Sequence, residues 1–215
     1  NDFNVTNALP ILRTGNGEYV LLQLYGLLEA VYESPFFWMM ADKPYVATAK
    51  DHRGAFTERT AAEALSGVFG RGRVYRNVDI YRPSGDRLGE IDVLVVYGNR
   101  ALVVQAKSKR LTMESRKGND QALKRDFALA VQSAADQSFA CAEALLDPAN
   151  LLKDASGDIV DVQRSYKAIH SLCILCDHYP ALAFQAEQFL NARTTEVIAK
   201  PLVFDLFALD VMSEL

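Results

Sequence analysis

The first third of the chain carries two helical patterns of apolar residues. In the first pattern, the apolar positions recur at the spacing of one helix face: Leu21, Leu24, Leu28 and Val31. Pro35 is expected to end this helix, because proline lacks the amide donor that a helix interior needs. A second helix is predicted over residues 56–69, with one apolar face. Gly70 and Gly72 follow it and are expected to break it.

From residue 74 onward the period changes from helical to extended. Residues 74–82 alternate as a half-buried strand does, and residues 90–97 and 100–108 are rich in β-branched side chains. Gly98 and Asn99 separate the last two runs. A two-residue connection with glycine first predicts a hairpin with a type II′ turn.

The second half of the chain predicts helices and strands in alternation. A long helix is expected over residues 119–146, and the polar stretch 151–165 is interpreted as a surface loop. Three further elements are predicted, a buried strand, a helix and a strand, over residues 169–177, 181–191 and 201–207. This order of elements indicates an α/β fold in which helices cover both faces of a mixed sheet.

Composition and charge narrow the class of protein. Of the 215 residues 50% are hydrophobic and 23% are charged, which is typical of a globular domain and excludes a disordered chain. The net charge of −4 excludes a uniformly basic nucleic-acid binder, although it permits a local basic patch. Three cysteines are too few for a disulfide framework, so a reducing, cytoplasmic location is expected.

The ends of the chain suggest how it is organised. It starts at Asn1 without a signal-peptide pattern and stops at Leu215 within a helical pattern, so we expect a fragment of a longer protein with further domains. Charged residues and a proline interrupt residues 19–40, so no membrane span is expected. We predict an N-terminal helical arm, residues 1–50, followed by one domain, residues 51–215.

The predicted hairpin brings four polar residues together. If Gly98 and Asn99 form the turn, then Asp92 lies opposite Gln105 and Glu90 lies opposite Lys107, and all four share one face at one end of the hairpin. The other face is then apolar and consists of Ile91, Val93, Val95, Leu102, Val104 and Ala106.

Two interpretations of this polar cluster are open. It is either a structural network, in which Glu90 pairs with Lys107 and the Gln105 amide donates to Asp92, or an oxygen-rich metal site. Carboxylate and amide oxygens are hard ligands that suit Mg²⁺ or Mn²⁺, and Lys107 would then address an anion.

These residues resemble the core of the PD-(D/E)xK nuclease superfamily, in which an aspartate begins one strand and (D/E/Q)-x-K lies on the next. Asp92 and Gln105-Ala106-Lys107 fit that pattern, and the glutamine form is similar to that of Mrr-type nucleases. Residues 54–58, GAFTE, resemble the Gly-x-x-Gly-Glu opening of nuclease-related (NERD-type) domains, with Thr57 in place of the second glycine. The resemblance implies a restriction-endonuclease-like fold with an αβββαβ core: a central mixed sheet flanked by helices, here preceded by the N-terminal helical arm.

The resemblance also implies a function, the metal-dependent endonucleolytic hydrolysis of phosphodiester bonds in DNA. Asp92, Gln105, the backbone carbonyl of Ala106 and Glu58 would then hold Mg²⁺ or Mn²⁺. Glu63 on the same predicted helix is the alternative acid. Lys107 would orient the attacking water or stabilise the transition state.

Two further residues are expected to lie next to the metal ligands and to position them without binding the metal. Glu90 shares the face of Asp92 on the predicted hairpin. Gln132 lies on the long predicted helix, where some relatives place a residue close to the site.

A basic segment accompanies these residues. Seven Lys or Arg and two acidic residues within 105–125 give a local charge of +5. The candidates for phosphate contacts are Lys109, Arg110, Arg116 and Lys117, and the alternative is a solvated loop and helix start. DNA is the expected partner, with RNA as the alternative.

A second function stays open on the sequence alone. The domain could be a catalytically inactive nuclease-fold module that binds nucleic acid or a protein partner.

Cys173 and Cys176 are expected to be buried thiols, because their spacing in a strand points them to opposite faces.

Overall fold

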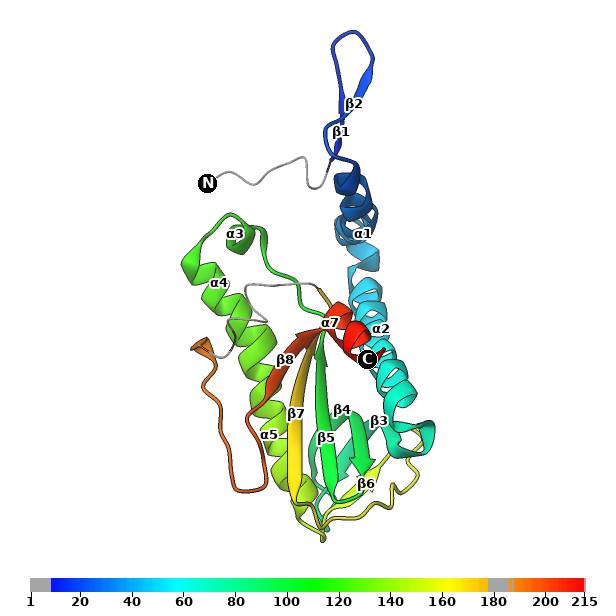
Figure 1. The fold of residues 1–215 in the computed structure, drawn as a ribbon, viewed down its shortest axis with the longest axis vertical. Helices are drawn as coiled ribbons and strands as arrows, with labels where there is room; N and C mark the ends of the chain where they lie inside the picture. Colours follow the sequence, from blue (N-terminus) through cyan, green and yellow to red (C-terminus); the bar gives the residue numbers. More distant parts are fainter. Residues whose placement is uncertain (1–8, 178–185, 187, 215) are drawn as a thin grey trace.

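The computed structural model describes residues 9–177, residue 186 and residues 188–214, without the side chains of Glu33, Met113 and Arg116. Its centre is a six-stranded sheet with helices on both faces (Figure 1). A helix, three antiparallel strands, a long helix and a parallel strand follow one another along the chain. The predicted α/β class with its αβββαβ core is confirmed.

The strands occur in the order β6-β3-β4-β5-β7-β8 across the sheet. Their bounds are Val74–Tyr81 (β3), Arg87–Tyr97 (β4), Arg100–Lys107 (β5), Leu151–Lys153 (β6), Ala168–Leu175 (β7) and Leu202–Asp205 (β8). Strands β6, β3, β4 and β5 pair antiparallel, whereas β5, β7 and β8 pair parallel. The sheet is therefore mixed, and β5 and β7 require a crossover between them.

Helices bury both faces of the sheet. Helix α5 (Ser133–Leu146) packs on one face, and helices α2 (Val46–Phe69) and α7 (Leu206–Ser213) pack on the other. The α5 cluster includes Leu94, Val103 and Phe139, and the α2 cluster includes Leu65, Val93 and Val104. Burial of both faces explains why these strands read as nearly continuous apolar runs.

The predicted hairpin is present with the expected register. Tyr97 pairs with Arg100 across the turn, and Gly98 has a φ of 57° while Asn99 does not have a positive φ. A positive φ at the first turn residue alone is what a type II′ turn requires, and glycine adopts it without strain.

The long helix over residues 119–146 is also present, as three consecutive segments. Helix α4 (Asp120–Phe127) continues through a π-helical turn, Ala128–Gln132, into α5, and a short helix α3 (Met113–Arg116) precedes it. Asn119 caps α4, because its side chain accepts from the amide of Ala122 at 2.9 Å.

The expected end of the first helix and the expected loop over residues 151–165 are both wrong. Pro35 lies inside α1 (Leu24–Ala41) and does not end it, because the helix continues with Phe36 and Phe37, which pack on arginines of the domain. Part of the expected loop 151–165 forms strand β6, because Leu152 is buried against Ile80. The helix predicted over residues 181–191 falls largely outside the described residues.

The N-terminal arm projects beyond the sheet (Figure 1). It consists of the hairpin β1 (Ile11–Arg13) and β2 (Tyr19–Leu21), followed by α1 and a 3-10 turn, Lys43–Tyr45. Helix α2 starts directly afterwards and runs through residue 50 without a break; a second 3-10 turn, Arg71–Arg73, separates it from β3. Within the described residues, none of the helices is both long and apolar enough to cross a bilayer.

A buried ion cluster fixes the base of the arm to the domain. Asp177, after β7, forms ion pairs with Arg53 of α2 and with Arg110, whose Nε lies 2.8 Å from Asp177 Oδ2. The Arg110 guanidinium lies over the rings of Phe36 and Phe37 of α1. Charges and aromatic rings thus connect the arm, α2 and the end of β7.

We predict that Asp177→Ala destabilises the protein strongly. Removing one partner of a buried ion cluster leaves the remaining charges uncompensated, which costs about 3–5 kcal/mol. Urea denaturation measures this loss, with Asp158→Ala in an exposed turn as the matched control. Equal stability of the two variants would contradict the role assigned to the cluster.

Candidate active site

The β4–β5 hairpin opens at the end far from its turn. The two strands pair as far as Val93 and Val104, beyond which β4 stays paired with β3 and β5 stays paired with β7. In the opening, the Ala106 amide donates to Asp92 Oδ2 at 2.7 Å. Strand amides lie in the plane of their sheet, so the Asp92 carboxylate lies there too. We call this opening the fork.

The alternation of side chains slips by one residue at the fork. Ile91 and Leu94 both pack in the α5 cluster, although strand residues three apart would normally face opposite sides. The prediction that Ile91 shares the face of Val93 is therefore wrong. The register places Asn77 of β3 opposite Asp92, and Asn77 has a φ of 50°, a conformation that interrupts the alternation.

The pKa of Asp92 is raised to about 6 from its ordinary value of 3.8. Burial is the largest cause, and the negative charges of Glu58 and Glu90 raise the pKa further. The hydrogen bond from Ala106 and the charge of Lys107 act in the opposite direction. Glu58 comes from α2 and Lys107 from β5, so the charges that act on Asp92 come from more than one element.

Asn77 connects Glu58 to this group. Its Nδ2 lies 3.1 Å from Glu58 Oε2 and 3.3 Å from Glu90 Oε1, so one amide donates to two carboxylates. Glu63, the alternative acid, is exposed and is not among the charges that act on Asp92. The geometry therefore favours Glu58. Asn77 was missed by sequence reasoning; the available signal was an asparagine inside a strand pattern, because asparagine is disfavoured in strands and adopts a positive φ more readily than most residues.

Gln105 is 3% exposed and donates from Nε2 to the Glu90 carbonyl oxygen at 2.6 Å. The Asp92–Gln105 pair of the structural interpretation is therefore replaced by the bond from Ala106 to Asp92. The N–H and C=O groups of one strand residue point to the same side, so the Ala106 carbonyl also faces the fork.

Lys107 contacts the long helix and not Glu90. Its Nζ lies 2.6 Å from Gln137 Oε1 on α5, while Glu90 pairs with Arg87 at 2.6 Å. The Glu90–Lys107 pair of the structural interpretation is thus wrong in the described contacts. Arg87 also binds Asp79, through Nε at 2.8 Å.

A pocket of about 390 Å³ opens beside the fork. Its walls come from β4, β5 and α5, and its polar lining consists of Arg87, Glu90, Asp92, Gln105, Lys107, Gln137 and Cys141. Cys141 was also missed by sequence reasoning; its Sγ lies 3.3 Å from the Glu90 carbonyl oxygen, and burial raises its pKa to about 11.

Gln132 does not reach this pocket. Its side chain instead binds Asp136 and the backbone of Asn191, at 3.1 Å and 3.0–3.1 Å. Gln132 ends the π-helical turn, which shifts the phase of the helix, and Gln137 points at Lys107 in its place.

The four residues that were expected to contact phosphate lie in different environments. Arg110 is buried in the ion cluster with Asp177, so it is withdrawn from the proposed nucleic-acid surface. Lys109 pairs with Asp126 at 2.9 Å, which gives it a structural partner. Lys117 is exposed, and the side chain of Arg116 lies outside the described residues.

Cys173 and Cys176 are buried free thiols in the clusters of opposite faces, as the strand parity predicts. Cys173 packs against Ala134 and Ala135 of α5, whereas Cys176 lies beside Thr57 and the buried ion cluster of Asp177.

The donor set at the fork fits a hard divalent cation. It offers the carboxylates of Asp92 and Glu58, the Gln105 Oε1 and the Ala106 carbonyl, all of them oxygen atoms. A cation there would favour the charged form of Asp92, which burial and, to a smaller extent, the charges of Glu58 and Glu90 disfavour. Only two of these donors are carboxylates, and no group of three or more His, Cys, Asp or Glu side chains in the described part of the chain is arranged for a metal.

The raised pKa of Asp92 predicts a specific pH dependence of the free energy of unfolding. Its pKa is raised on folding, so its contribution is fully present below pH 4 and is lost as the pH rises through about 6. Relative to Asp92→Asn, the wild type should lose about 2 kcal/mol between pH 4 and pH 7 in metal-free buffer. Urea denaturation of both proteins at the two pH values measures this difference, and parallel curves would contradict the environment assigned to Asp92.

The positive φ of Asn77 predicts an unusual order of stability among substitutions at this position. Asn77→Gly removes the Cβ and keeps the backbone conformation available, whereas Asn77→Ala keeps a Cβ in the left-handed region, which costs about 1–2 kcal/mol relative to glycine. Both variants lose the amide that donates to Glu58 and Glu90, so the difference between their stabilities reports the cost of the backbone conformation alone. Thermal melts should rank Asn77→Gly above Asn77→Ala, the reverse of the usual preference inside a strand.

Comparison with known proteins places this site in a family. No curated protein and no solved structure matches the chain. A family model described as the nuclease-related domain (NERD) matches residues 53–176, which span α2, the fork and β7. That match covers more than half of the 215 residues, and the chain belongs to the nuclease-related domain family.

Proposed function

We propose that this domain hydrolyses phosphodiester bonds in DNA with the help of Mg²⁺ or Mn²⁺. The observation that carries the proposal is the fork, where the Asp92 carboxylate with its raised pKa lies in the sheet plane and is influenced by Glu58 and Lys107. A strongly perturbed acid beside a lysine in a pocket is typical of a catalytic site. Membership of the nuclease-related family supports the reaction class.

Each residue of the fork has a proposed role. Asp92, Glu58, Gln105 Oε1 and the Ala106 carbonyl would hold the cation. When bound, the cation would lower the pKa of a water molecule and neutralise charge on the scissile phosphate. Asn77 would hold the Glu58 carboxylate in place through its 3.1 Å bond.

Lys107 is the proposed electrostatic catalyst. Its ammonium lines the pocket and donates to Gln137 Oε1, which fixes its position without neutralising its charge. A positive charge held there would stabilise the negative charge that develops on phosphate in the transition state. Gln137 is thus a positioning residue for Lys107.

A surface for the nucleic acid is proposed beside the pocket. Lys117 is the exposed residue that remains from the expected phosphate contacts, because Arg87 at the pocket wall, like Lys109, already pairs with acidic side chains. DNA is the proposed substrate and RNA the alternative.

The alternative function is a catalytically inactive module that binds nucleic acid or a protein. The observation that favours it is the Gln105 amide, which donates to the Glu90 carbonyl and partly occupies the fork. Glutamine also brings one negative charge fewer than an acid at this position, which weakens attraction for a cation.

Cleavage assays on plasmid, linear and single-stranded DNA, with RNA in parallel, test the proposal. Cleavage should require Mg²⁺ or Mn²⁺ and should stop with EDTA. Lys107→Ala and Asp92→Ala should each reduce the rate by about 10²-fold or more. Lys167→Ala, which changes the same residue type at the turn end of the sheet, should have no effect.

Metal-dependent cleavage that survives Asp92→Ala would contradict the site assigned here. If the wild type cleaves none of the substrates with either metal while still binding nucleic acid, the inactive module is the correct function. Melting temperatures of all variants separate a catalytic loss from unfolding.

A further inference from the structure

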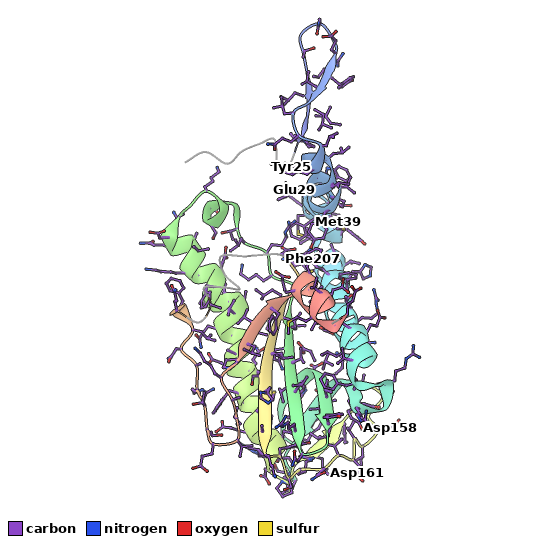
Figure 2. All side chains as sticks on the ribbon, in the orientation of Figure 1. Tyr25, Glu29, Met39, Asp158, Asp161 and Phe207 are labelled. Atoms are coloured by element: carbon purple, nitrogen blue, oxygen red, sulfur yellow. The ribbon has the colours of Figure 1, made fainter. Side chains whose placement is uncertain are left out.

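The arm concentrates the exposed apolar surface of the molecule. Of the twenty-five exposed large apolar side chains in the described residues, thirteen lie between Leu9 and Trp38. Figure 2 shows Tyr25 and Glu29 on the part of α1 that projects away from the sheet, whereas Phe207 lies where α1 and α7 meet. A two-stranded hairpin and one helix are too small to be stable in water with such a surface uncovered.

One face of α1 carries a continuous apolar stripe. Its exposed members recur at intervals of four and three residues along the helix, and these are Leu24 (82%), Leu28 (74%), Val31 (67%) and Trp38 (70%). Pro35 occupies the remaining position of this repeat. At 3.6 residues per turn, all five lie within roughly 40° of one line. Alternating intervals of four and three are the spacing of a helix that packs along a second helix.

The opposite side of α1 is already covered by the rest of the arm and by the domain. Gly26 and Ala30 are buried there, and a Cβ on Gly26 would meet Pro10 at 3.6 Å. Phe37 lies on the same side and packs under Arg110. The stripe therefore points away from these contacts, and its four exposed members are not covered by the described part of the domain.

The chemistry of the stripe limits what can cover it. It has no charged residue, so it does not suit nucleic acid. Residues 9–41 contain one arginine and three glutamates, whereas helices that lie on anionic membranes carry Lys and Arg beside their apolar face. An uncharged apolar stripe is complementary to a second copy of itself, as a two-fold interface requires.

The area of the stripe also fits a dimer. Together with Tyr25, the four exposed stripe residues leave roughly 700 Å² uncovered, at about 200 Å² for a large side chain. A stable interface buries about 800 Å² on each partner. We propose that two copies of this chain associate through the α1 stripes, packed side by side about a two-fold axis. This proposal does not depend on the nuclease activity.

Light scattering on the 215-residue chain, over about 5–100 μM, tests the association. The wild type should have a mass of 47.6 kDa, twice 23.8 kDa. Leu28→Glu should weaken the dimer by at least about 100-fold, because each copy would bury a charge in the apolar interface without a partner of opposite sign. Val68→Glu changes an equally apolar, 52% exposed position on α2 and should leave the dimer intact.

Crosslinking locates the contact independently. Val31 is the midpoint of the stripe, so it meets its own copy whether the helices run parallel or antiparallel. A bismaleimide should join Val31→Cys chains into a covalent dimer, whereas Val68→Cys chains should stay without a covalent crosslink. The three native cysteines are buried, so they should not react. A monomeric wild type, a dimer unaffected by Leu28→Glu, or equal crosslinking of both cysteine variants would overturn the proposal.

Discussion

The site depends on one hydrogen bond, from the Ala106 amide to the carboxylate of Asp92. In a continuous hairpin that amide would donate to a backbone carbonyl of β4. A side-chain acceptor takes its place, so the pairing of β4 and β5 ends at Val93 and Val104 and the sheet opens. The opening brings a carboxylate into the sheet plane, where burial raises its pKa to about 6. A charged group is tolerated there because the amide and Lys107 offset part of the cost.

The surrounding fold keeps this opening in place. Apolar clusters on both faces fix β4 and β5 on either side of it, so the fork cannot close without unpacking α2 or α5. Helix α2 brings Glu58 to the fork, and α5 brings Gln137 to Lys107. The positive φ of Asn77 keeps β3 paired with β4 at the point where the alternation of side chains shifts by one residue. The Asn77 amide also donates to the carboxylates of Glu58 and Glu90. Fold stability and site geometry therefore rest on the same contacts.

The sequence predicted the sheet and the position of Asp92, Gln105 and Lys107 at one pocket, because apolar alternation and the Gly98-Asn99 turn determine the hairpin register. It mispredicted the local pairs, because the parity argument assumed that pairing continues past Val93, whereas the strands separate there. Asn77 gave only a weak signal, since asparagine tolerates a positive φ without requiring one. The charge run was also misleading at Arg110, because only the tertiary position of Asp177 shows that this arginine is buried.

The central claim is that the fork binds the cation on which hydrolysis depends. Anomalous diffraction from crystals soaked in Mn²⁺ tests it most directly, because manganese is located without any assumption about activity. The account predicts one strong peak within about 2 Å of the Asp92 carboxylate and the Ala106 carbonyl oxygen. A peak elsewhere, or an ordered fork without manganese at a concentration that supports cleavage, would contradict it.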